Sequence, residues 1–243
     1  MSAIAGETHV NENNVVELRQ YTLRSGKRDA LIELFEREFI AQQNAVGARV
    51  LGTFRDLDDP DRFVWMRGFD SMAGRADALT SFYTGPVWKA HRDAANATML
   101  DCDNVLLLRP VDGGGAAFAE LGAGFGMLTA TIHHLARTPP ADFLALFRSE
   151  LRPRLIELGA TPSVALVTED APNSFPRLPV RQDHPVFVWF ARWPDEGAAA
   201  AFDARFAALS GWRDRAPEAV LPALMSKPER LRLKATTHAA PDR

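Results

Sequence analysis

The sequence predicts an α+β fold made of two copies of one module, packed sheet to sheet. Three observations lead to this prediction: part of the chain repeats itself, both copies show the same order of strand and helix patterns, and a Gly-rich segment separates them. With 243 residues and 47% hydrophobic content, the chain can bury one large core or two small ones. We therefore expect it to fold without a partner chain.

The internal repeat has two offsets. Six residues of the first half recur 112 residues later: Leu23, Leu34, Phe35, Glu38, Gly47 and Ala48. Farther along the chain, seven other residues recur 124 positions later: Phe63, Val64, Trp65, Ala76, Phe82, Trp88 and Leu107. The difference is a 12-residue insertion between Thr168 and Pro185, which could be a lid or a surface decoration. Because the period far exceeds the roughly 20 to 50 residues of stacking repeats, each copy should be a domain-sized unit.

In the first copy, alternation and β-branched residues predict a strand at 15–23. A helix follows, because Leu31, Leu34, Phe35 and Phe39 fall on one helical face. The remaining predicted elements are strands at 48–56 and 62–69 that pair as a hairpin, an Ala-rich helix at 71–83, a short segment carrying Trp88, and a strand at 104–110. The order is βαββαβ, the ferredoxin-like motif.

The second copy repeats this order. A strand at 127–135 precedes a helix whose apolar face includes Phe143 and Phe147, and Pro153 should kink or split that helix. The remaining predicted elements are strands at 161–168 and 186–193, a helix at 195–209, a segment carrying Trp212, and a strand at 228–234.

These patterns divide the chain into a first module at 15–110, a Gly-rich linker at 111–126 and a second module at 127–236. Helices cover one face of a ferredoxin-like sheet and leave the other bare, and an apolar face cannot stay in water. The two sheets should therefore meet face to face as a barrel, with a pocket where their inner faces fail to touch.

Two motifs resemble a known family. The segment from Glu17 to Lys27, ELRQYTLRSGK, is similar to the opening strand and turn of NIPSNAP domains, and the segment from Trp65 to Ser71, WMRGFDS, is similar to their second signature. The resemblance covers about 15–110 and reaches the second copy only through the repeat. It implies a fold of the dimeric α+β barrel group, which includes cofactor-free monooxygenases, isomerases and haem enzymes, so it implies architecture more than chemistry.

Candidate site residues lie on the first and third strands. Alternation places Glu17, Arg19 and Tyr21 on one face, which we expect to line the barrel. Glu17 and Arg19 could pair with each other, either to hold an acidic ligand or to satisfy the interior. Trp65 and Arg67 share a face of the third strand, and Trp189 is the counterpart of Trp65; on two facing sheets such aromatics could form an apolar ligand pocket or plain core.

Among the six histidines, His133 is the preferred titratable group, because it aligns with Tyr21 and should face the barrel. It could act as a general base, or it could be a hydrogen-bonded strand residue. Tyr21 or the pair of Glu17 and Arg19 could handle protons in its place. His91 is a weaker candidate for ligand binding, since its context favours a surface position over a ligand role. His184 lies in the 12-residue insertion.

Other classes of function are disfavoured. The 28 basic and 31 acidic residues are scattered, so nucleic acid is an unexpected ligand. No apolar run approaches the roughly 20 residues of a membrane span, and the single cysteine, Cys102, suits a reducing compartment such as the cytoplasm. The acidic segment 56–61 lacks the spacing of a calcium loop, and we expect no metal site.

Three functions stay open at this stage. The first is a pocket for a small apolar or aromatic molecule, with cofactor-free oxygenase or isomerase chemistry and no cofactor. The second is haem binding, in which His133 or His91 would ligate the iron. The third is a noncatalytic scaffold whose outer helices carry the contacts. A homo-oligomer is compatible with each, given the edges that such sheets leave.

Overall fold

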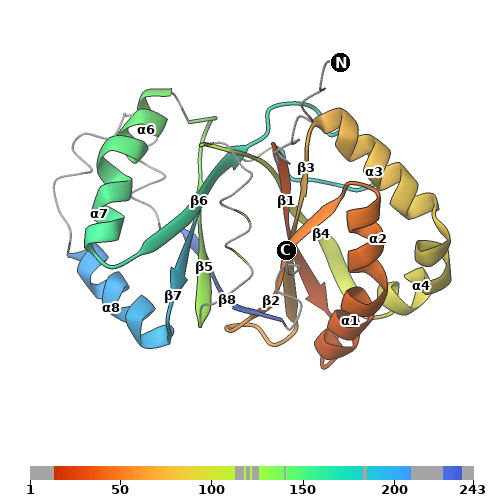
Figure 1. The fold of residues 1–243 in the computed structure, drawn as a ribbon. Coiled ribbons are helices and arrows are strands. Elements are labelled where there is room, and N and C mark those ends of the chain that lie inside the picture. Colours follow the sequence, from red (N-terminus) through yellow and green to blue (C-terminus); the bar gives the residue numbers. More distant parts are fainter. Residues whose placement is uncertain are drawn as a thin grey trace, which may run out of the picture.

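A computed structural model describes residues 14–112, 118, 121, 126–139, 141–182, 185–208 and 227–236. His184, Trp212 and most of the predicted Gly-rich linker lie outside these residues. The described part is an α+β protein in which two groups of helices flank a central set of strands (Figure 1).

The first module contains all the elements predicted for it. They are β1 (Val15–Leu23), α1 (Arg28–Leu34), the π-helical segment η1 (Phe35–Phe39), α2 (Ile40–Ala45), β2 (Arg49–Asp56), β3 (Arg62–Phe69), α3 (Met72–Thr84), α4 (Pro86–Asn96) and β4 (Met99–Pro110). Two differ in extent from the prediction. Trp88 lies in a true helix, α4, which begins with Pro86 at a position where a missing N–H costs nothing, and β4 begins at Met99 instead of 104.

The second module follows the same plan. Its described elements are β5 (Met127–His134), α6 (Ala141–Leu146), the π-helical segment η2 (Phe147–Leu151), α7 (Arg152–Glu157), β6 (Thr161–Thr168), β7 (Val186–Trp193), α8 (Glu196–Ala207) and β8 (Glu229–Ala235). The π-helical segment ends before Pro153, and η1 lies at the matching place in the first module, where Ala41 stands in place of proline. Pro153 is therefore not what divides this helix.

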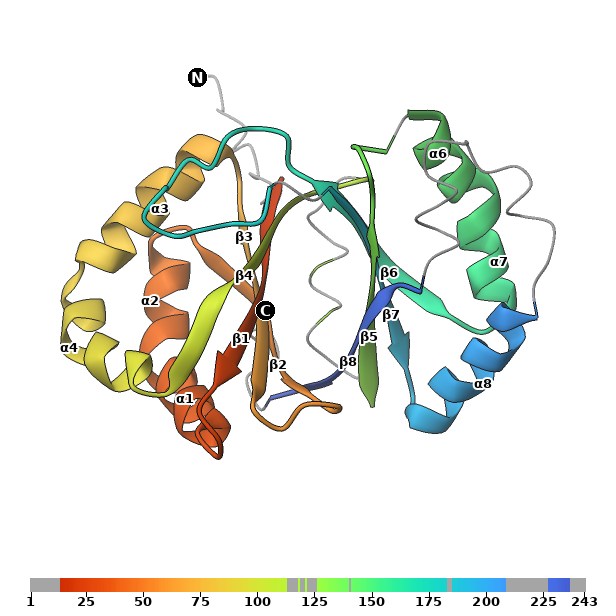
Figure 2. The same ribbon diagram turned by 180° about the vertical axis from the view of Figure 1, so that it is seen from behind.

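The strands form one closed barrel in the order β1-β3-β2-β8-β5-β7-β6-β4. Each module contributes four neighbouring strands in the ferredoxin-like order, and the antiparallel pairs β2–β8 and β4–β6 join the two sheets. The helices of each module lie on the outside of its own sheet, on opposite flanks of the barrel (Figures 1 and 2). The predicted sheet-to-sheet arrangement is confirmed.

The barrel interior is filled by apolar side chains from all eight strands. The interior cluster includes Val16 and Leu18 of β1, and the linker residues Phe118 and Leu121 also belong to it, with at most 1% of their surface exposed. Since side chains alternate along a strand, Glu17, Arg19 and Tyr21 point the other way, toward the helices. The expectation that this polar set lines the barrel is wrong: the interior is apolar, and the polar face lies under α1–α4.

The same correction applies to the third strand of each module. Trp65 packs with residues of the module-one helices such as Phe35, and Trp189 packs with Phe202 of α8. The two tryptophans therefore lie on opposite outer faces of the barrel wall and do not face each other across it.

Candidate functional site

The register between β1 and β3 brings the charged residues together. Glu17 lies opposite Arg67, and Arg19 lies opposite Trp65. Residues directly opposite in antiparallel strands project from the same face, here the face under the helices. Local alternation and strand pairing are thus sufficient to gather these side chains in one place.

Glu17 sits at the centre of three guanidinium groups. Its Oε2 lies 2.6 Å from Arg19 Nη1 and 2.7 Å from Arg67 Nη2, and its Oε1 lies 2.7 Å from Arg75 Nη2. All four side chains are buried, none more than 1% exposed. We call them the arginine cluster. It holds two more positive than negative charges, and the predicted pair of Glu17 with Arg19 is one part of it.

The cluster keeps Glu17 ionised. Burial alone would raise the pKa of this carboxyl, but the charges of Arg67, Arg19 and Arg75 outweigh it and hold the pKa of Glu17 well below its usual range. A carboxylate this weakly basic and this enclosed is a poor proton acceptor. Glu17 therefore organises the arginines, and its predicted role as a catalytic base has no geometric support.

Arg75 was missed by sequence reasoning. It comes from α3 and donates from Nε to Glu17 Oε1 at 2.7 Å. A signal was available, because Arg75 shares the apolar stripe of its helix with Ala78, Leu79 and Phe82 at helical spacing. A lone arginine on such a stripe points into the core and needs a buried partner.

Arg19 links the cluster to a tyrosine. Its Nε donates to Tyr21 Oη at 2.9 Å, and its guanidinium carbon lies 5.4 Å from the ring centroids of both Tyr21 and Trp65. Burial raises the pKa of Tyr21 to about 12, although Arg19 opposes the shift. Tyr21 is therefore a protonated phenol at neutral pH. Since its oxygen accepts from Arg19, its own proton is available to another acceptor.

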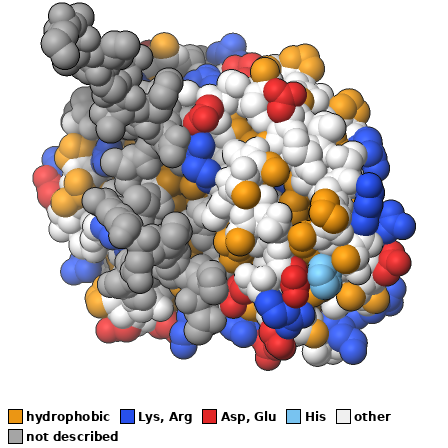
Figure 3. Space-filling model, turned by 45° about the vertical axis from the view of Figure 1, so that its right-hand side comes forward, with side chains coloured by type: hydrophobic (Ala, Val, Ile, Leu, Met, Phe, Trp, Pro, Cys, Tyr) orange, Lys and Arg blue, Asp and Glu red, His pale blue; other side chains and the backbone are white. Residues whose placement is uncertain are grey.

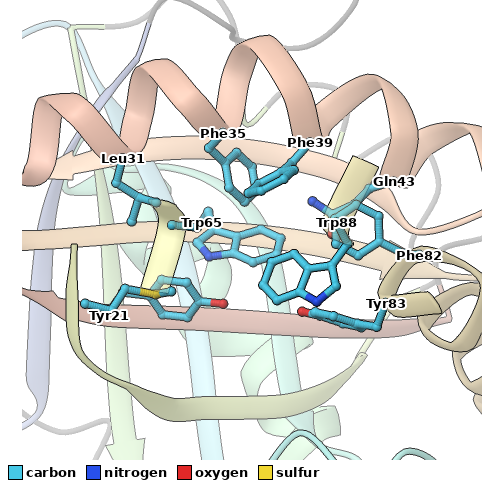
Figure 4. Close-up of a pocket in the computed structure, with 11 residues that line it drawn as sticks. Tyr21, Leu31, Phe35, Phe39, Gln43, Trp65, Phe82, Tyr83 and Trp88 are labelled. Atoms are coloured by element: carbon cyan, nitrogen blue, oxygen red, sulfur yellow. The ribbon is translucent and has the colours of Figure 1, made fainter. Parts of the chain in front are cut away.

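Tyr21 and Trp65 line a pocket between the sheet and the helices of module one. The lining residues come from β1, β3, β4 and all the module-one helices: Tyr21, Leu31, Phe35, Phe39, Gln43, Trp65, Phe82, Tyr83, Trp88, Ala95 and Met99. Figure 4 shows Phe35 and Phe39 extending from the helix toward Trp65. In the same view the hydroxyl groups of Tyr21 and Tyr83 point toward each other from opposite sides. The pocket is a mostly aromatic chamber with a few polar atoms.

The polar atoms of the pocket are mainly hydrogen-bond donors. Trp65 Nε1 is buried without a hydrogen-bond partner, and a buried N–H in this state costs about 1 to 3 kcal/mol. Gln43 Oε1 is already engaged by Arg67 Nη1 at 2.9 Å. No carboxylate is among the lining residues. A bound molecule that offers an acceptor would relieve the unpaired donor.

The cavity measures about 30 Å³, room for roughly two water molecules. A larger ligand needs its outer wall to move. Tyr83, Trp88 and Met99 form that wall and are only half-buried, unlike the inner lining. On the surface turned forward in Figure 3, hydrophobic side chains lie in separate groups between charged ones.

The insertion of module two reaches this site. We call residues 169–182 the strap; it leaves β6 and crosses to module one (Figure 2). Its backbone bonds to β4 through Glu169 N to Leu107 O and Arg181 N to Val105 O, at 2.9 and 2.8 Å. Phe175, 8% exposed, stacks on Tyr83 with ring centroids 6.0 Å apart. The strap thus braces the outer wall of the pocket.

The strap also completes the arginine cluster. Arg75 Nη1 donates to Asn173 Oδ1 at 2.9 Å and to Ser174 Oγ at 3.2 Å. A continuous series of hydrogen bonds and ion pairs therefore runs from the strap through Arg75, Glu17 and Arg19 to the hydroxyl of Tyr21. The sequence indicated a lid or a decoration here, and the contacts show a brace between the modules.

The other predicted site residues lie elsewhere. His133 is 8% exposed under the helices of module two, with its ring 6.2 Å from that of Phe187, so it does not face the barrel. His91 lies on α4 with Nε2 3.4 Å from Glu38 Oε2, outside the pocket lining. Neither histidine meets Tyr21 in the pocket, and a role for His133 within module two stays a prediction.

The part of the chain that the structure describes shows neither a metal-binding cluster nor a membrane-spanning helix. No three His, Cys, Asp or Glu side chains gather there in a way that could hold a metal ion. No helix of that part is both long enough and apolar enough to cross a bilayer.

Comparison with solved structures supports the barrel fold. An anthrone oxidase-like protein matches 93% of this chain and 93% of its own at 12% identity and a TM-score of 0.57. A proposed monooxygenase from Lactobacillus acidophilus matches 91% of this chain and 93% of its own at 12% identity and a TM-score of 0.53. At such identities the likeness shows the fold alone. The comparison with curated proteins gives no match.

The first module also matches a sequence family. A NIPSNAP family protein from Agrobacterium tumefaciens covers 40% of this chain and 93% of its own at 25% identity and a TM-score of 0.38. The NIPSNAP family model matches residues 16–112, which include β1, β3 and the arginine cluster. Residues 16–112, which make up the first module, are thus similar to NIPSNAP domains.

Proposed function

We propose that this protein binds a small aromatic compound in the module-one pocket and handles protons there through the pair of Tyr21 and Arg19. The observation that carries the proposal is the pocket itself: aromatic walls, a tyrosine hydroxyl fixed by a buried arginine at 2.9 Å, and an unpaired indole N–H beside it. Ligand sites are typically apolar with a few oriented polar groups.

Cofactor-free oxygenase or isomerase chemistry suits this arrangement. Both reactions pass through a substrate anion, whose proton would be released to solvent here, and both need a fixed donor for the oxygen on which charge develops. Tyr21 supplies such a donor, because its pKa of about 12 keeps its proton at neutral pH. The fold is shared with an anthrone oxidase-like protein and a proposed monooxygenase, which makes oxygen uptake the first activity to measure.

The two residues predicted to ligate haem iron, His91 and His133, are not in the lining of this pocket, so we favour the small aromatic ligand for it. The cytoplasm stays our proposed location, based on the single cysteine of the sequence.

A cavity-filling substitution tests the proposal. Ala95, 1% exposed, lines the pocket from α4, so Ala95→Val should occupy part of the cavity. We expect the wild type to bind 2-naphthol by titration calorimetry and Ala95→Val to bind it at least tenfold more weakly. His133→Phe, at the position equivalent to Tyr21 in module two, should bind like the wild type. Unchanged affinity in Ala95→Val would move the site elsewhere.

A further inference from the structure

We infer that the ligand of this pocket is an aromatic oxyanion, a phenolate or an aromatic carboxylate, bound in its charged form. This inference rests on the proposed function and adds the charge state of the ligand. It is carried by the arginine cluster and by the direction in which the polar atoms of the pocket point.

The arginine cluster carries an excess of positive charge. Arg19, Arg67 and Arg75 share one carboxylate, which leaves two positive charges in excess within a fully buried cluster. Buried charges are costly unless opposite charges compensate them. An anion in the adjacent pocket would supply part of this compensation, whereas a neutral ligand of the same shape would not.

The arginine cluster contacts the residues that line the pocket. Two of the three guanidinium groups touch the pocket lining directly: Arg19 bonds to Tyr21 Oη and stacks on Trp65, and Arg67 donates to Gln43. The excess charge thus lies one side chain behind the pocket wall. At this range, with little water between, an ionic interaction is much stronger than in bulk solvent.

The pocket offers hydrogen-bond donors that are not yet engaged. The Tyr21 proton is uncommitted, because its oxygen already accepts from Arg19, and Trp65 Nε1 has no hydrogen-bond partner. Figure 4 shows the Tyr83 hydroxyl aimed into the same space. Hydrogen bonds to an ionised acceptor are roughly twice as strong as neutral ones, so these donors favour an oxyanion over an ether or a hydrocarbon.

Other ionisable groups near the pocket do not reverse this balance. Glu38 and His91 contact each other at the outer surface of the helices. Asp101 and Asp103 of β4 are exposed to solvent. Burial raises the pKa of Cys102, which keeps that thiol protonated. Tyr21 stays neutral up to a pH of about 12. The groups that act on a bound ligand at neutral pH are therefore the buried arginines and Glu17.

The inference predicts that binding lowers the pKa of a phenol, whose proton passes to solvent. Three probes of similar size test it on the wild-type protein: 4-nitrophenol, its methyl ether 4-nitroanisole, and 4-nitrobenzoate. Bound 4-nitrophenol should show the phenolate absorption band at a pH at least one unit below that at which the free compound ionises. One unit means that the phenolate binds about tenfold more tightly than the phenol. The ether should bind at least tenfold more weakly than the phenolate.

The possible outcomes separate the two proposals. Equal binding of 4-nitrophenol and 4-nitroanisole, with no shift of the phenol pKa, would overturn the oxyanion inference and leave the aromatic pocket intact. Binding of 4-nitrobenzoate alone would identify the carboxylate as the source of the charge and support the inference. Failure of all three probes to bind would overturn both.

Two variants locate the effect. Tyr21→Phe removes the hydroxyl donor and should reduce the shift of the phenol pKa by about half a unit or more, while His133→Phe should leave it unchanged. Arg75→Gln removes one positive charge without altering the pocket lining, and should also reduce the shift. A full shift in both Tyr21→Phe and a folded Arg75→Gln protein would show that the cluster does not set the charge of the ligand.

Discussion

Neutralising Glu17 tests the arginine cluster directly. Glu17→Gln keeps the size of the side chain but leaves three buried guanidinium groups without a counter-charge, and the new amide N–H₂ faces donors. Breaking one buried ion pair by removing a partner costs about 3 to 5 kcal/mol. Because whole domains are stable by only about 5 to 15 kcal/mol, this is a large fraction of the total.

The assay is urea unfolding followed by far-UV circular dichroism. With a slope of about 3 kcal/mol per molar urea, a loss of 3 to 5 kcal/mol lowers the midpoint by about 1 to 1.7 M. Thr129, the equivalent of Glu17 in module two, provides the control: it only accepts from Trp193 Nε1 at 2.9 Å. Thr129→Ser keeps that hydroxyl and should cost about 1 kcal/mol, the value of one buried methyl group.

The pH dependence adds a second readout. The pKa of Glu17 is depressed in the folded state, so its contribution is fully present above the usual glutamate pKa of about 4.3 and is lost as pH falls toward the folded value. The stability difference between wild type and Glu17→Gln should therefore shrink below pH 4.3. A midpoint within about 0.3 M of wild type at pH 7 would refute the view that Glu17 holds the cluster together.

Three further predictions concern the strap, the turns and the surface. Phe175→Ala should cost about 3 to 5 kcal/mol and, by unstacking Tyr83, speed amide hydrogen exchange in α3; unchanged exchange would separate the strap from the pocket wall. Gly47→Ala and Gly159→Ala, at φ of 90° and 98°, should each lower stability by about 1 to 2 kcal/mol, measured by urea unfolding, and equal stability to wild type would contradict the strain. His134→Ala removes an exposed contact with Glu229 and should change the free energy of unfolding, measured by urea unfolding, by less than about 1 kcal/mol.

The fold could be predicted because its signals are local and repeated. The repeat fixed the module, alternation located the strands, and the bare sheet face implied a second sheet. The repeated Gly47 and Gly159 mark the same left-handed turn before β2 and β6, where only glycine is unstrained. Each of these signals depends on neighbours along the chain and does not need the tertiary structure.

The site was harder, because both faces of the strands are buried. Alternation separates Glu17 and Arg19 from Val16 and Leu18 but does not say which set faces the helices. The polar set, expected in the barrel, lies where Arg75 of α3 can reach it. The strap contacts and the cavity depend on long-range packing, which no pattern within one segment reveals.

Module two lacks every charged residue of the arginine cluster. In module two the positions of Glu17, Arg19, Arg67 and Arg75 are occupied by Thr129, Thr131, Ala191 and Ala199. All four charges are absent together. Without Glu17 the three arginines would be buried with no counter-charge, at a cost of several kcal/mol, which is a physical reason for their joint absence from module two.

This asymmetry explains why a strap runs from module two to module one. Module two has no buried arginine at the position of Arg75 to brace, yet its own insertion supplies Asn173 and Ser174 to the Arg75 of module one. In an assembly of identical modules, every copy would have to carry both the cluster and the strap. Joining two copies in one chain allows one to keep the charged pocket while the other becomes its support. Ligand binding should therefore stabilise the cluster and the strap together. Calorimetry would measure this as a smaller rise of the unfolding temperature on addition of 4-nitrophenol in the Phe175→Ala protein than in the wild type.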